Sequence, residues 1–165
     1  STISSETTAA TTGKTGVLRH DPMAMIPFCG YNMGDYFAHW VKMGKLLGDK
    51  APKVFNVNWF RTDKDGKFLW PGYGENLRVL EWIINRCEEK VDAKKTPVGY
   101  IPMDKDINLE GSGVSEDTLK DLLDIDKGLW EKEVENIKDF YKMFEENLPE
   151  ELENELKLLE SRLKN

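Results

Sequence analysis

The stretch FRTDKDGKFLWPGYGEN, residues 60–76, constrains the fold more than any other part of the sequence. Its four aromatic side chains are interspersed with three glycines and a proline. Glycine and proline interrupt helices and central strands, so these rings must lie on turns. A ring on a turn either packs onto a core or receives a ligand, because exposed apolar surface is unfavourable. The composition of the stretch leaves both interpretations open.

The residues before and within this stretch predict a helix and then a hairpin. Residues 17–34 are apolar but broken by prolines and glycines, which indicates an irregular packed segment. Residues 35–47 have helical spacing of apolar side chains. The apolar face of that helix is made of Phe37, Trp40, Val41 and Leu47. Residues 53–60 are rich in β-branched and aromatic residues and predict a buried strand, which a turn over residues 62–66 joins to residues 67–70.

A second helix is predicted directly after the stretch. It covers residues 76–90 and begins at Glu75 or Asn76. Its side chains at helical spacing are Leu77, Leu80, Ile84 and Cys87. Residues 96–102 form a short strand between prolines.

The last third of the chain is helical in pattern. Ser115 opens a short helix, Asp126 a longer one, and Pro149 stands where a third should begin. The apolar face of the second of these is Leu129, Trp130, Val134, Ile137, Tyr141 and Phe144. The third repeats leucine at Leu152, Leu156, Leu159 and Leu163. The whole predicts an α/β (mixed) fold, with strands and loops first and helices last.

Charge and composition exclude several classes of function. The net charge of −7 is unfavourable for a general binder of nucleic acid or of anionic membranes. No apolar run in the sequence approaches the length of a membrane span. Cys29 and Cys87 are isolated in the sequence, as is typical of a protein in the reducing cytoplasm.

The sequence contains no complete short motif for phosphate binding, metal binding or a catalytic triad. TGKT at residues 12–15 resembles the end of a phosphate loop, but Thr8 stands where the pattern needs glycine. His20 and His39 lie apart and lack the set of carboxylate or cysteine partners that a metal site would bring close in sequence, so core packing or exposure is favoured over metal binding. The carboxylates of the terminal helices are expected to lie on a solvated outer face.

A ligand for the aromatic stretch would be a flat heterocycle. Aromatic faces stack on nucleobases, and Gly72 and Gly74 let backbone groups approach the edge of a base. The amide of Asn76 offers both a donor and an acceptor, which suits the mixed edge of guanine.

Three longer motifs carry a resemblance to a known family. They are HDPMAMIPFCGYNMGDYFAHW, VNWFRTDKDGKFLWPGYGENLRVLEW and TPVGYIP. Together they resemble the C-terminal part of GTP-dependent phosphoenolpyruvate carboxykinase, from Ser5 to about Leu163. The resemblance implies an α/β piece of the catalytic domain of that enzyme.

The resemblance implies roles at the matching positions. Trp59, Phe60, Phe68 and Tyr73 correspond to an aromatic guanine pocket, and Tyr73, Gly74, Glu75 and Asn76 to the segment that contacts the base. Residues 1–17 resemble a flexible lid that closes over the active site, and residues 18–165 then form one nucleotide-base-binding piece. The lid residues are Ser5, Glu6, Thr7, Thr8, Ala9, Ala10, Thr11, Thr12, Gly13 and Lys14.

The resemblance also implies a reaction and its partners. The family converts oxaloacetate and GTP to phosphoenolpyruvate, GDP and CO₂ with Mn²⁺ or Mg²⁺, as a cytoplasmic monomer. Its catalytic and metal-binding residues lie upstream of the matching segment, so this chain alone is expected to hold none of them and to be inactive. Two alternatives stay open: a freestanding purine-binding or regulatory module, and a structural helical domain whose loop aromatics are buried.

Overall fold

The computed structural model describes residues 3–5, 18–20 and 25–165. The chain divides into two compact units. The first unit joins residues 1–51 to residues 127–165, and the second unit is residues 52–126. The expected boundaries, a lid over residues 1–17 and one piece over residues 18–165, stay predictions.

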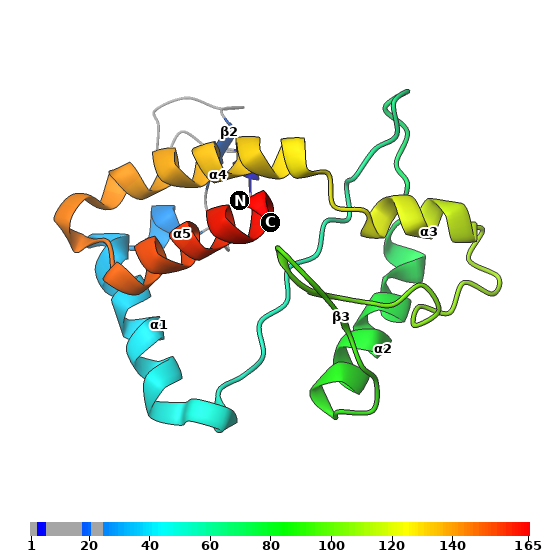
Figure 1. Cartoon of the computed structure of the whole chain (residues 1–165), viewed down its shortest axis with the longest axis horizontal. Helices are drawn as coiled ribbons and strands as arrows, with labels where there is room; N and C mark the ends of the chain where they lie inside the picture. The colour runs from blue at the N-terminus through cyan, green and yellow to red at the C-terminus, as the bar shows by residue number, and fades with distance from the viewer. Residues whose placement is uncertain (1–2, 6–17, 21–24) are drawn as a thin grey trace. The chain divides into compact units, whose positions relative to one another are not determined.

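The first unit is mainly helical. Strands β1 (Ile3–Ser5) and β2 (Leu18–His20) pair antiparallel, with Ile3 opposite His20. Its helices are η2 (Ile26–Phe28), α1 (Met33–Leu47), η3 (Gly48–Lys50), α4 (Lys127–Tyr141), η5 (Lys142–Asn147) and α5 (Glu150–Lys164), where η marks a 3-10 helix. Figure 1 shows α4 and α5 side by side, in orange and red.

The core of the first unit is largely aromatic. Met33 and Phe37 of α1 are buried with Phe140 of α4 and Phe144 of η5. The ring of Phe144 meets those of Phe37 and Phe140 edge-on, with centroids 5.4 and 4.9 Å apart. Edge-to-face pairs of this kind each add about 0.5–1.5 kcal/mol beyond the area they bury. Segments more than ninety residues apart in sequence are therefore held together by this cluster.

The sequence predicts the helices of this unit well and two of their faces less well. On α1, Phe37 is buried as expected, but Trp40 and Leu47 are 37% and 38% exposed, so their assignment to the inner face was wrong. Leu47 is the last residue of α1, and Trp40 only meets the ring of Phe37 edge-on. The helix expected over residues 35–47 is α1, and the leucine-rich helix begins directly after Pro149, as α5. Val134 and Leu163 are buried as expected. Leu129 is 59% exposed, so its assignment to the inner face was wrong. It lies in the first turn of α4, at the end of the helix away from Phe140.

Lys138 links α4 to α5 by an ion pair, and we expect the stability that this pair contributes to be lost in acid. Its Nζ lies 2.8 Å from Glu135 Oε1 on the same helix and 2.6 Å from Glu160 Oε1 on α5. The hydrogen bond from Lys138 lowers the pKa of Glu160 below its ordinary 4.5. A carboxyl group whose pKa is lowered by folding stabilises the fold at pH values above its unfolded-state pKa. This stabilisation is lost as the pH falls through the folded-state pKa. We therefore expect Lys138→Met to lower the urea midpoint at neutral pH, and the gap to the wild type to close in acid. A gap that persists unchanged in acid would show that the methylene stem of Lys138, rather than its charge, matters.

The second unit has two α-helices, one 3-10 helix and a small hairpin. Its elements are η4 (Tyr73–Glu75), α2 (Asn76–Cys87), β3 (Lys94–Thr96), β4 (Gly99–Ile101) and α3 (Glu116–Leu123). Trp70, Trp82, Ile107 and Leu119 form its buried core. Ser115 caps α3 through a hydrogen bond from Thr118 N to its Oγ, as the sequence predicts. Strand β4 lies within the short strand expected at residues 96–102, and its partner β3 was missed.

Helix α2 buries a different face from the predicted one. The side chains at Leu77, Leu80, Ile84 and Cys87 are all exposed. The inward face carries Trp82, which is 5% exposed, with Val79 and Ile83 packed beside it. Two apolar stripes run along this helix, and the one with tryptophan removes more surface from water when buried. The sequence pattern alone does not separate them.

The long strand expected over residues 53–60 is absent from the structure. Val54 is 92% exposed, and the amide of Phe60 donates to the side chain of Asn58 rather than to a ladder. The hairpin after it is real but short. Thr62 bridges Phe68, and Asp63 Oδ1 accepts from the amides of Asp65 and Lys67.

The described residues thus confirm a mixed and helix-rich fold. Two small two-stranded sheets accompany the helices. Within the same ranges, no helix combines the length and the apolar character needed to cross a membrane.

Candidate functional site

The aromatic stretch divides into buried and exposed rings. Trp70 is 5% exposed, and Trp59 is half-buried against the same core. Phe60, Phe68 and Tyr73 are 74%, 58% and 93% exposed. The core-packing interpretation therefore holds for the two tryptophans, and the ligand interpretation stays a prediction for the other three rings. The tryptophans support the loop, and the other three rings are open to solvent.

The exposed phenylalanines form a pair at the hairpin. Their ring centroids are 6.1 Å apart at an interplanar angle of 62°, an edge-to-face arrangement. Phe68 is held there by its bridge to Thr62, and the next residue continues the hairpin with a hydrogen bond from Leu69 N to Arg61 O. Arg61 in turn donates to the carbonyls of Leu122 and Asp124 at the end of α3. The pair thus stands on a hairpin tied to the rest of the second unit.

Gly72 and Gly74 bring the chain from Trp70 into α2. Gly72 has φ of +110°, a conformation that a residue with a side chain rarely adopts. A β-carbon on Gly74 would meet no atom within 4 Å, so the space beside its backbone is open. Tyr73 lies between these glycines at the start of η4.

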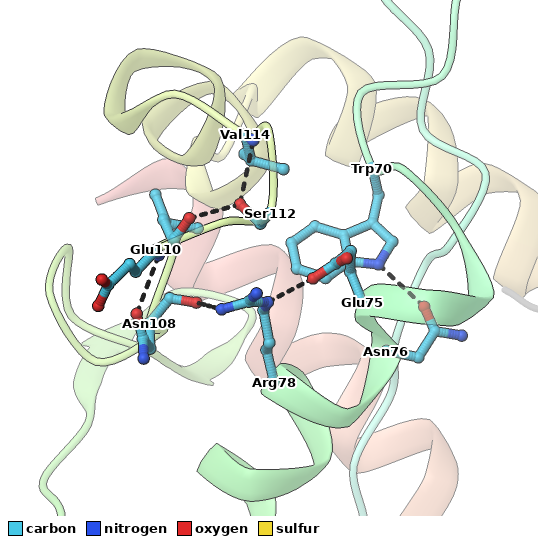
Figure 2. Close-up of polar contacts among 9 residues, drawn as sticks. Trp70, Glu75, Asn76, Arg78, Asn108, Glu110, Ser112 and Val114 are labelled. Carbon is cyan, nitrogen blue, oxygen red and sulfur yellow. Dashed lines mark hydrogen bonds and ion pairs between the residues drawn. The ribbon is translucent and has the colours of Figure 1, made fainter.

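Asn76 is oriented by the buried tryptophan. The indole Nε1–H of Trp70 donates to Asn76 Oδ1 at 2.9 Å, as Figure 2 shows. Indole nitrogen is a donor only, so the amide oxygen must face it. Among the hydrogen bonds of the described residues, none leaves from Asn76 Nδ2. Its NH₂ group is the part of the amide left for a ligand.

Glu75 is engaged with its own helix. Its carboxylate accepts from Arg78 Nε, three residues along, and both side chains are about a quarter exposed. Arg78 also donates to the carbonyl of Asn108 at 2.7 Å, which ties the start of α2 to the loop before α3 (Figure 2). A direct contact of the Glu75 carboxylate with a base stays a prediction, and its visible role is to anchor this turn.

Three residues that support the candidate site were not identified from the sequence as having this role. They are Trp70, Arg78 and Asn108. Arg78 could have been found, because a carboxylate and an arginine three apart on a helix pair readily. Nothing in the sequence signals that an indole six residues before Asn76 orients its amide.

A separate hollow of about 400 Å³ lies between the hairpin and the end of α3. It is lined by Arg61, Thr62, Asp63, Lys64, Leu69, Asp121 and Asp124. None of the predicted base-site residues lines it. The candidate site is therefore an open surface of exposed rings and not this hollow.

Two further expectations concern the lid and a metal. Of the lid residues, Ser5 ends β1, and Glu6–Lys14 lie outside the described residues. In the part of the chain that the structure describes, no three His, Cys, Asp or Glu side chains lie close enough to hold a metal ion. The described residues do not fit Mn²⁺ or Mg²⁺.

Comparison with known proteins agrees with the motifs. The family model described as the phosphoenolpyruvate carboxykinase C-terminal P-loop domain matches residues 1–162. Phosphoenolpyruvate carboxykinase (GTP) of Chlamydia caviae is 51% identical over 163 residues, which cover 98% of this chain and 27% of that protein. The protein of the same name from Renibacterium salmoninarum is 50% identical over 165 residues, 99% of this chain and 27% of that protein.

A vertebrate relative is equally similar. The cytosolic phosphoenolpyruvate carboxykinase (GTP) of Gallus gallus is 52% identical over 161 residues, which cover 97% of this chain and 26% of that protein. The chain thus spans about a quarter of the length of these relatives. With a family match over nearly its whole length, this chain belongs to the phosphoenolpyruvate carboxykinase family, in the C-terminal P-loop domain.

Proposed function

We propose that this chain supplies the guanine-binding segment of a GTP-dependent phosphoenolpyruvate carboxykinase. The observation that supports it is the exposure of Phe60, Phe68 and Tyr73 on a loop that two tryptophans, one buried and one half-buried, hold against the core. Aromatic rings exposed together on an ordered loop are typical of a surface that binds a ligand or another part of a protein. The freestanding purine-binding module is the less favoured alternative, since the named relatives are all carboxykinases.

The base is recognised by stacking and by one amide. Stacking on an aromatic ring contributes about 1–3 kcal/mol per base. The free NH₂ of Asn76 donates to the O6 carbonyl of guanine, a position where adenine carries an amino group. A site built to pair with O6 rejects adenine, because the two donors would then face each other unpaired.

The proposal extends to the reaction of the whole enzyme, of which this chain spans about a quarter. Oxaloacetate and GTP give phosphoenolpyruvate, GDP and CO₂, in the cytoplasm and in a monomeric enzyme. The part of this chain is to hold the base, and residues 5–14 close as a lid that excludes water from the enolate formed by decarboxylation.

A titration with GDP and ADP tests the base site. We expect saturable quenching of tryptophan fluorescence by GDP and a much weaker response to ADP, because Trp70 bonds directly to the amide that reads the base. Tyr73→Leu should weaken GDP binding about tenfold through loss of stacking.

Tyr100→Leu is the matched control for Tyr73. Tyr100 lies on β4 in the same unit, is 61% exposed and contacts Arg86 rather than the loop. Its removal should leave GDP affinity unchanged. Equal responses to GDP and ADP in the wild type would reject the guanine site.

A further inference from the structure

The hydrogen bond between Trp70 and Asn76 has an asymmetry that bears on specificity. An asparagine amide can rotate by half a turn with little change of shape, which exchanges a donor for an acceptor at its outer edge. Only one of these orientations lets the oxygen meet the indole N–H at 2.9 Å. The other orientation would direct the NH₂ group of Asn76 at the indole N–H, so that two donors would face each other.

Both ends of this contact are held from behind. Trp70 is 5% exposed and packs with Trp82, Ile107 and Leu119, so its ring has no freedom to follow the amide. The backbone of Asn76 begins α2, and the adjoining turn is anchored by Arg78, which binds the Glu75 carboxylate and the Asn108 carbonyl (Figure 2).

We propose that Trp70 is a positioning residue that fixes the Asn76 amide with its NH₂ outward and thereby sets the preference for a 6-oxopurine. The inference rests on the proposed base site and deepens it. Asn76 touches the base, and Trp70 determines which of its two groups does so. Without the indole N–H, the Asn76 amide rotates freely. With its oxygen outward it accepts from the 6-amino group of adenine, and with its nitrogen outward it donates to O6 of guanine, so neither base is preferred.

The test compares two tryptophans of one core. Trp70→Phe removes the indole donor to Asn76, and Trp82→Phe removes an indole of equal burial whose Nε1 donates to Asp106 Oδ2 at 3.3 Å. Affinities for GDP, inosine diphosphate and ADP are measured by calorimetry, which does not depend on the tryptophans. Inosine diphosphate shares O6 and N1–H with GDP but lacks the 2-amino group, so it reports on the 6-oxo edge without a contribution from that group.

We expect Trp70→Phe to reduce the preference for GDP over ADP about tenfold, with the same loss for inosine diphosphate. Trp82→Phe should leave both preferences within about twofold of the wild type. A Trp70→Phe protein that keeps the wild-type preference overturns the positioning role, while the GDP preference itself still upholds the proposed function. A wild type without any GDP preference rejects the proposed function instead, and with it the part of the inference that concerns specificity.

A second measurement needs neither nucleotide nor a folded variant. In the wild type, hydrogen exchange followed by NMR should show the Trp70 indole proton protected and the two Asn76 amide protons at fixed, distinct shifts. An indole proton that exchanges as fast as one on the surface overturns the positioning role, whatever the variants do.

Discussion

Replacing Gly34 by alanine is expected to destabilise the first unit by about 3 kcal/mol, the upper part of the range for overpacked sites. A β-carbon at this position would lie 2.4 Å from the carbonyl oxygen of Asn147 and 2.8 Å from its carbon. Neither atom belongs to a flexible side chain, so the start of α1 and the end of η5 would have to separate.

That separation would break polar contacts as well. Asn32 caps α1 by accepting from Gly34 N at 2.8 Å, and its Nδ2 donates to Phe144 O at 3.3 Å. Asn147 donates from its side chain to Asp35 at 2.9 Å. Moving the two segments apart costs these hydrogen bonds together with the packing of Phe144, so the effect is concentrated at one glycine.

Gly44→Ala is the matched control, because it makes the same change in the same helix. A β-carbon there meets nothing within 4 Å. Alanine should then stabilise α1 by about 0.5–1 kcal/mol, the ordinary gain over glycine in a helix. Urea unfolding followed by circular dichroism gives both values. Shifts of the same sign for the two variants would contradict the close approach at Gly34.

The opposite expectations for two glycines of one helix show where sequence-based prediction ends. Helix α1 itself was predicted, because its signal, the helical spacing of apolar side chains, is local. The need for glycine at position 34 arises from Asn147, which is more than a hundred residues away in sequence. No local pattern reports such a contact.

The same limit applies to the candidate site. The sequence identified the aromatic stretch and Asn76, since glycines and aromatics on one loop are an unusual combination. It did not separate Trp59 and Trp70, which pack on the core, from Phe60, Phe68 and Tyr73, which do not. All five share the same loop composition, and burial depends on a core built by residues as distant as Leu119. The resemblance assigned Trp59 to the same guanine pocket as the three exposed rings, so it did not make this division either.

Helix α2 offers the sharpest test of that division, because its two apolar stripes make opposite predictions. The sequence pattern places Ile84 inside, whereas the structure leaves it 56% exposed and buries Trp82 at 5%. Trp82→Ala should therefore destabilise the second unit by about 3–5 kcal/mol, the usual cost of truncating a buried aromatic side chain. It also removes the edge-on contact with Phe55, whose ring centroid is 6.0 Å away, and the hydrogen bond to Asp106.

Ile84→Ala is the control on the outer stripe of the same helix. It should cost less than about 1 kcal/mol, because little apolar area is lost and alanine has the higher helix propensity. Denaturant midpoints of the two variants, read by circular dichroism, decide between the stripes. A larger loss for Ile84→Ala than for Trp82→Ala would mean that α2 faces the core as the sequence pattern has it. Asn76, Arg78 and the first turn of α2 would then be turned away from Trp70, and the amide could not be held by the indole. The orientation of this helix therefore decides both the core of the second unit and the group that Asn76 presents to a base.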